Sequence, residues 1–344
     1  MPERMKFLLC TLLVLGACSS TPPVDPVADD PDTTPQDQVA DFDSSFSAVV
    51  GIFANVPEDA PTAALLGTRR QGSGVVIDND GLVLTIGYLI LEAEEVIVVG
   101  PEGKQIPAQL VAYDHTTGLG LVRARKPPQG SALRLGDSKT LSQGDPVLAV
   151  SFDGRNPVVA AKVVSRRPFA GSWEYLQENA IFTIPPHHEY GGAALINSDG
   201  ELVGIGSLLV NDAIIGERPV IGNMFVPVED LKPILAALIK KGRRNDPVPP
   251  WLGIYTDEAE GRVYITRLAE SGPGEDAGLK RGDIIIGVDG KRVGTMIDYL
   301  RKIRKQGKAG SEIALDILPY GSHDLTINKI SVKSVDRHDW LQLH

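Results

Sequence analysis

The side chains in this sequence that could carry polar chemistry gather in a few short segments. Ser73 lies between two glycines, Asp114 precedes His115, and the pair His187-His188 comes directly before Glu189. A serine, a histidine and an aspartate are the groups that nucleophilic hydrolysis uses. Histidines and carboxylates are also common zinc ligands. The sequence therefore raises two chemistries, hydrolysis and metal binding.

The spacing of these residues supports neither chemistry. Adjacent histidines point in different directions on an extended chain, and residues 187–189 match no metal-ligand motif. We therefore predict a solvated loop there, with no metal and no cofactor. We interpret Ser73 as a turn residue of its Gly-Ser-Gly segment and not as a nucleophile.

Composition narrows the class of protein. The chain has 344 residues, enough for two or three domains, and is 42% hydrophobic and 23% charged, which is typical of a globular protein. A net charge of -10 argues against a nucleic-acid partner, because binding to phosphates needs clustered Lys and Arg. Both cysteines, Cys10 and Cys18, lie near the N-terminus. We therefore expect no disulfide in the folded part.

The N-terminus carries a targeting signal. Basic residues precede an apolar run, Phe7–Gly16, that is too short to span a bilayer. The run ends before Cys18 in a pattern that resembles a bacterial lipobox, which predicts a signal peptide over residues 1–17 and a lipidated Cys18 that attaches the chain to the membrane. Ser19 favours the outer membrane. An ordinary cleavable signal peptide is the alternative. Residues 18–45 are acidic and proline-rich and should form a flexible tether.

The elements that must position these residues are mostly strands. Valine-rich segments separated by Gly, Pro and Asp fall into two successive groups, which predict two small β-barrels. The expected strands are residues 72–77, 81–85, 96–99, 106–111, 119–122, 147–151, 158–165, 180–184, 194–196 and 202–209. A helix is expected over Val228–Lys241, a linker over 243–250, a third unit over 251–335 and a tail over 336–344.

Four segments show a family likeness. Gly72–Thr85, Leu135–Ser138, Gly144–Ala149 and Asn197–Ile205 resemble HtrA/DegP-type trypsin-like serine proteases. The likeness continues into a PDZ domain, whose run Glu270–Ile285 is similar to bacterial PDZ sequences. The resemblance implies a mainly β protein, with a trypsin-like double β-barrel over residues 46–242 followed by a PDZ domain over 251–335.

The same resemblance implies that the catalytic triad is replaced. Tyr88 stands at the position of the family's histidine, Gly118 at that of its aspartate and Gly191 at that of its serine, while Glu189 enters the loop of the oxyanion hole. A phenol is a poor general base at neutral pH, and glycine has no side chain for proton transfer. This predicts a pseudoprotease that is not an enzyme.

The PDZ region keeps the features that peptide binding needs. By resemblance, the loop that captures a C-terminal carboxylate is Trp251, Leu252, Gly253 and Ile254. A helix over residues 295–303 would form the other wall of the groove, and Met296 and Leu300 either line that groove or pack in the core.

We therefore predict a membrane-anchored periplasmic scaffold or adaptor that binds proteins, including C-terminal peptides, through its PDZ domain. The alternatives are a serine-type endopeptidase or a quality-control chaperone with a rearranged site. Homo-oligomerisation, which is common in the family, is left open.

Overall fold

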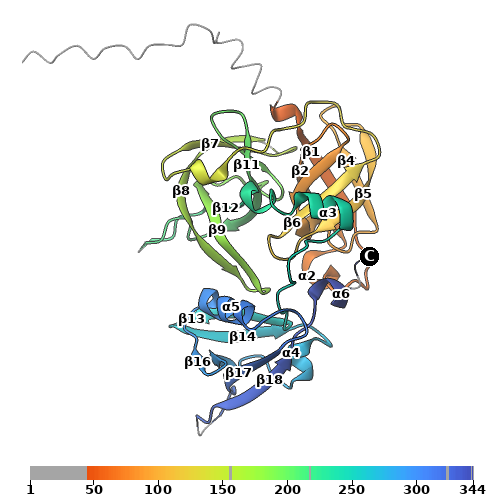
Figure 1. Ribbon diagram of the computed structural model, residues 1–344. Coiled ribbons are helices and arrows are strands. Elements are labelled where there is room, and N and C mark those ends of the chain that lie inside the picture. Colours follow the sequence, from red (N-terminus) through yellow and green to blue (C-terminus); the bar gives the residue numbers. More distant parts are fainter. Residues whose placement is uncertain (1–44, 155–156, 217, 323–324, 342, 344) are drawn as a thin grey trace, which may run out of the picture.

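Turn residues divide the first part of the chain into strands that pair in a closed ring. In the computed structural model, which describes residues 45–154, 157–216, 218–322, 325–341 and 343, six antiparallel strands form a barrel in the order β1-β2-β3-β6-β5-β4 (Figure 1). The strands are β1 Val49–Asn55, β2 Arg69–Val76, β3 Leu82–Ile86, β4 Glu95–Val99, β5 Gln105–Tyr113 and β6 Leu119–Ala124. Short helical segments between them are α2 Ala63–Leu66 and η1 Gly87–Leu89.

A second closed barrel follows, in the order β10-β11-β12-β9-β8-β7. Its elements are η2 Ser138–Thr140, β7 Pro146–Val150, β8 Val158–Gly171, β9 Tyr175–Ile184, β10 Ala194–Ile196, β11 Leu202–Val210 and β12 Gly222–Pro227. One buried apolar cluster runs from the first barrel into β10 and β11, so the two barrels share part of their core. The predicted trypsin-like double β-barrel is confirmed, although strands β1 and β12 were not expected from the sequence.

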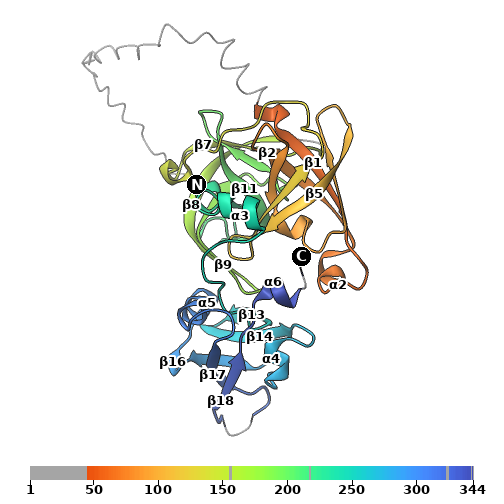
Figure 2. The same ribbon diagram turned by 45° about the vertical axis from the view of Figure 1, so that its right-hand side comes forward.

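The β8–β9 hairpin is longer than predicted. The expected strands end at Ser165 and resume at residue 180, whereas the observed strands continue to Gly171 and resume at Tyr175. Pro168 lies at a register shift between β8 and β9, which is where a residue without an N–H is tolerated in a sheet. Both views show the hairpin extending out of the second barrel to the C-terminal domain (Figures 1 and 2).

The helix predicted over Val228–Lys241 is correct only in its second half. A short turn, η3 Val228–Asp230, comes first, and the α-helix α3 spans Leu235–Lys241. Pro233 explains the late start, because a proline disfavours the helical conformation in the residue before it.

The third unit has the PDZ architecture. Its sheet has the order β13-β14-β15-β17-β18, with β16 paired to β15. Its elements are β13 Ile254–Ala259, β14 Arg262–Leu268, α4 Pro273–Asp276, β15 Ile284–Val288, β16 Lys291–Arg292, α5 Met296–Lys305, β17 Glu312–Leu318 and β18 Asn328–Lys333. Thr295 caps α5 by accepting a hydrogen bond from the Asp298 N–H. Strand β13 lies at one end of the sheet, beside α5.

The predicted C-terminal tail packs on the protein. It forms helix α6, Arg337–Trp340, and Leu341 is buried against Leu91 and Tyr113 of the first barrel. None of the helices in the described part of the chain combines the length and the apolar character needed to cross a bilayer.

Candidate functional site: a barrel cleft and a carboxylate loop

The three triad-equivalent positions lie together where the barrels meet. Tyr88 is in η1, directly after β3, and its hydroxyl donates to the Ser207 carbonyl at 3.1 Å. A Cβ placed on Gly191 would lie 3.0 Å from the Tyr88 hydroxyl oxygen, so the phenol fills the space beside that residue. The Gly87 N–H donates to the Gly118 carbonyl at 2.7 Å, which brings Gly118 next to η1.

The chemistry of this cluster differs from that of a triad. Burial raises the pKa of the Tyr88 phenol, and the neighbouring Tyr190 raises it further, so Tyr88 is a neutral hydroxyl at pH 7. Its hydrogen is directed to a carbonyl, and the two glycines offer only backbone groups. The cluster as described holds no imidazole and no carboxylate.

Two hollows adjoin the cluster. A cavity of about 540 Å³ is lined by Tyr88, Gly118, Trp173, Tyr175 and other residues of the barrels and the PDZ domain. A second hollow of about 420 Å³ is lined by Ser73, Tyr88, Gly191 and Glu189 among others. The exposed Glu189 therefore lies at the rim of a depression that a polypeptide segment could enter.

The other polar residues of the barrels that the sequence raised as candidates do not form a catalytic or metal site. Ser73 lies within strand β2, not in a turn as predicted; it is buried, and its hydroxyl oxygen accepts a hydrogen bond from the Phe152 N–H at 3.0 Å. The predicted solvated loop is wrong for His187, which is buried, whereas His188 and Glu189 are exposed. The two histidines differ in exposure, as expected for neighbours that point apart. Among the described residues, no three His, Cys, Asp or Glu side chains form a group that could hold a metal.

The predicted carboxylate loop begins at Trp251 and leads into β13. Gly253 has φ 70°, a left-handed conformation that glycine adopts without strain. This conformation turns successive N–H groups of the loop toward one point, as in other anion-binding backbone loops.

A carboxylate lies at that point. The Leu252 N–H donates to Glu174 Oε2 at 3.0 Å, and the Ile254 N–H donates to Glu174 Oε1 at 2.6 Å. Glu174 belongs to the turn of the β8–β9 hairpin of the second barrel. Its role was not predicted from the sequence, because no motif marks it.

The other predicted groove residues are covered. Trp251, Leu252, Ile254, Met296 and Leu300 are all buried, so their peptide-binding roles remain predictions. Trp251 packs on Trp340 of α6, with ring centroids 4.7 Å apart. Cys18, the predicted lipidation site, lies outside the described residues.

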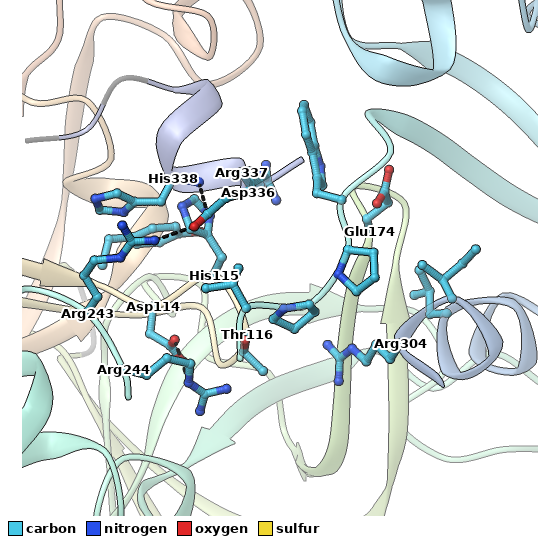
Figure 3. Close-up of a pocket in the computed structure, with 17 residues that line it drawn as sticks. Asp114, His115, Thr116, Glu174, Arg243, Arg244, Arg304, Asp336, Arg337 and His338 are labelled. Carbon is cyan, nitrogen blue, oxygen red and sulfur yellow. Dashed lines mark hydrogen bonds and ion pairs between the residues drawn. The ribbon is translucent and has the colours of Figure 1, made fainter. Parts of the chain in front are cut away.

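Glu174 also borders a small cavity of about 70 Å³ between the barrels, the linker and the PDZ domain. Figure 3 shows Glu174, Arg304 and Arg337 around this cavity. Burial raises the pKa of Glu174 to about 7, against the opposing effects of the backbone N–H groups of residues 252–254 and of Arg337. The loss of hydration therefore outweighs the hydrogen bonds that stabilise the ionised form.

Comparison with known proteins agrees with this architecture. A trypsin-like peptidase domain matches residues 72–205, and a PDZ domain matches residues 264–318. The chain is 29% identical over 283 residues to the serine protease Do-like HtrA of Bacillus subtilis, an alignment that covers 73% of this chain and 61% of that protein. The chain thus combines the trypsin-like peptidase and PDZ domains in the order found in HtrA-type proteins.

Two further HtrA-type proteins are similar, one in sequence and one in fold. A probable periplasmic serine protease do/HhoA-like of Haemophilus influenzae is 29% identical over 271 residues, covering 75% of this chain. The chain spans only 57% of that relative's length. A solved structure, the HtrA-type protease AlgW with decapeptide, shares the fold, with a TM-score of 0.52, 19% identity, and coverage of 87% of this chain and 98% of its own.

One prediction needs correction. The replaced triad led us to predict that the chain is not an enzyme, whereas the HtrA-family relatives, aligned over about three quarters of it, are named serine proteases. The prediction rested on residue types at three positions. In triad proteases, loss of triad members leaves a residual catalysis that comes from the oxyanion hole and from substrate binding. Those three positions alone therefore do not exclude the family's activity.

Proposed function

We propose that this protein recognises the C-termini of other proteins through its PDZ domain, and that it does so at the periplasmic face of a bacterial membrane. The observation that carries the proposal is the pair of hydrogen bonds from the Leu252 and Ile254 N–H groups to one carboxylate. A loop that holds the carboxylate of Glu174 has the geometry to hold the terminal carboxylate of a peptide.

The edge position of β13 supports the same function. A strand at the end of a sheet has backbone groups that no second strand of its sheet pairs, and an extended peptide can pair with them; helix α5 beside it supplies an apolar wall. Backbone pairing would give affinity, and the apolar side chains near α5 would select the last residues of the partner.

The test is binding of peptides with free C-termini to the full chain carrying Glu174→Ala, which empties the loop. Each peptide is paired with its C-terminally amidated form. We expect binding that amidation abolishes, because an amide cannot replace both carboxylate oxygens as an acceptor. Equal binding of the two forms, or none, would contradict a carboxylate-reading function.

For the location, we propose that a lipidated Cys18 anchors the protein and that Ser19 directs it to the outer membrane. The periplasmic relative from Haemophilus influenzae supports the compartment. Mass spectrometry of the N-terminal peptide from membranes of the producing bacterium tests the anchor. An unmodified cysteine, or cleavage at another residue, would overturn it.

Serine-type endopeptidase activity is the second candidate, favoured by the names of the relatives and by the hollow beside Glu189 and Gly191. Labelling with a fluorophosphonate, followed by identification of the modified serine, tests it directly. A labelled serine that lines the hollow would assign the nucleophile. No labelling, together with no cleavage of an unfolded protein substrate, would remove this candidate.

A further inference from the structure

The turn of the β8–β9 hairpin follows β13 in the way an added strand does. Besides the two hydrogen bonds from Leu252 and Ile254 to Glu174, the Thr256 N–H donates to the Ser172 carbonyl at 2.9 Å. The three donors are alternate residues of the loop and of β13. Alternate N–H groups are the ones that the edge of a strand offers to a neighbour.

The side-chain contacts continue this arrangement. Leu176, at the start of β9, is buried in the same apolar cluster as Leu252, Ile254 and Leu300 of the PDZ domain. An apolar side chain of the second barrel therefore occupies the space between β13 and α5, where the wall of a peptide groove would contact a ligand.

Helix α5 holds the hairpin from the other side. The Arg304 guanidinium donates to the Leu176 carbonyl at 3.0 Å. The hairpin is thus bound along both walls of the groove, with a carboxylate in the loop at its end. Figure 2 shows it lying against α5 and β13.

The backbone of Glu174 is unusual for its residue type. Its φ is 58°, in the left-handed region where glycine or asparagine is the common choice at a hairpin turn. A glutamate in this conformation is strained locally, and such strain is often retained where a side chain has a function. The hydrogen bonds of its carboxylate to the loop supply that function.

We propose that Glu174 is an internal substitute for a C-terminal carboxylate, so that the β8–β9 hairpin closes the PDZ groove and a partner's C-terminus binds only by displacing it. The inference rests on the proposed function, because it concerns the regulation of the same site. The partner is a flexible protein C-terminus with an apolar final segment, since it must replace both the carboxylate of Glu174 and the side chain of Leu176.

The first experiment compares peptide binding by the full wild-type chain with that of Glu174→Ala, using the free and amidated peptides. We expect the variant to bind free C-termini about tenfold or more tightly, because the competing hydrogen bonds between the loop and Glu174 are removed. Glu174→Gly should behave in the same way while removing the strain of the turn, which guards against a folding defect.

The matched control is Glu178→Ala. Glu178 lies on the same hairpin and pairs with Arg301 of α5, yet it does not contact the carboxylate loop. Exposed ion pairs contribute little to stability, so this variant should bind within about threefold of the wild type.

The second experiment needs no peptide. Hydrogen–deuterium exchange should show the amides of residues 252–254 protected in the wild type and in Glu178→Ala, and exchanging faster in Glu174→Ala. Equal exchange in all three proteins would refute the internal contact.

The binding experiment separates the two proposals. If the wild type binds free C-termini as tightly as Glu174→Ala, the internal substitute is refuted while the PDZ function stands. If neither protein binds any of them, the proposed function fails, and displacement by C-termini fails with it.

Discussion

The pKa of Glu174 predicts that closure of the PDZ groove depends on pH. A glutamate has an ordinary pKa of 4.5, and burial in the closed groove raises it to about 7. Between these two pKa values, the carboxyl group of Glu174 is protonated in the closed form and ionised in the open form.

Closure of the groove is therefore strongest below pH 4.5 and weakens as the pH rises through 7. From these two pKa values, the closing equilibrium falls about 20-fold between pH 5.5 and 7.5. This is an upper limit, because the side chain is only half-buried.

The other titratable and charged groups around Glu174 do not reverse the direction of this pH dependence. Arg337 of α6 favours the ionised carboxylate, and this is already part of the pKa of about 7. Tyr299 of α5 stays neutral, because burial raises the pKa of its phenol well above its usual range. His115 and His338 border the same small cavity, and burial lowers the pKa of both, so they titrate at lower pH than Glu174.

The assay is hydrogen exchange of residues 252–254 without peptide, expressed as protection relative to the intrinsic rate at each pH. Wild-type protection should fall by up to about 20-fold from pH 5.5 to 7.5. Glu174→Gln cannot ionise, so its protection should not change with pH. Wild-type protection that is constant over this range, or that increases, would refute the reasoning.

Three further predictions concern the barrels, each measured as the free energy of unfolding in urea. Arg70→Ala should lose about 3–5 kcal/mol, because the buried guanidinium binds the carbonyls of Tyr88 and Leu91, while the exposed Arg69→Ala should lose under about 0.5 kcal/mol. Equal losses would contradict this role. Gly192→Ala should lose several kcal/mol more than Gly103→Ala, because both have positive φ but only the Cβ at residue 192 would meet a backbone oxygen, at 1.9 Å. Similar values would show that the loop relaxes. Tyr175→Phe should lose about 1–2 kcal/mol by leaving the Thr117 carbonyl without its 2.7 Å hydrogen bond, and an unchanged midpoint would exclude that bond as a contributor.

Much of the fold could be predicted from local sequence. Asp78 shows why: its carboxylate accepts hydrogen bonds from the Asp80 and Leu82 N–H groups, so the Asp/Gly turn between β2 and β3 forms from neighbouring residues. The residue types at positions 88, 118 and 191 also follow directly from the sequence. Their meaning for activity does not, because it depends on what else lines the cleft and on the relatives' named activity.

The long hairpin could not be predicted in the same way. Residues 166–179 include Pro168 and several charged side chains, and they lack the alternation of a half-buried strand. Their strand conformation comes from pairing between β8 and β9 and from contact with α5. The contact with α5 joins parts of the chain more than 100 residues apart, for example Leu176 and Arg304.

By itself, the sequence determined the order of the domains, the family motifs and the glycine-containing loop before β13, because each depends on residues that are neighbours in the chain. Only the tertiary structure decided that Glu174 occupies that loop and that Leu176 fills the apolar space beside it. The loop needs only backbone N–H groups, which every sequence supplies, so the identity of its ligand depends on which carboxylate the fold brings to it.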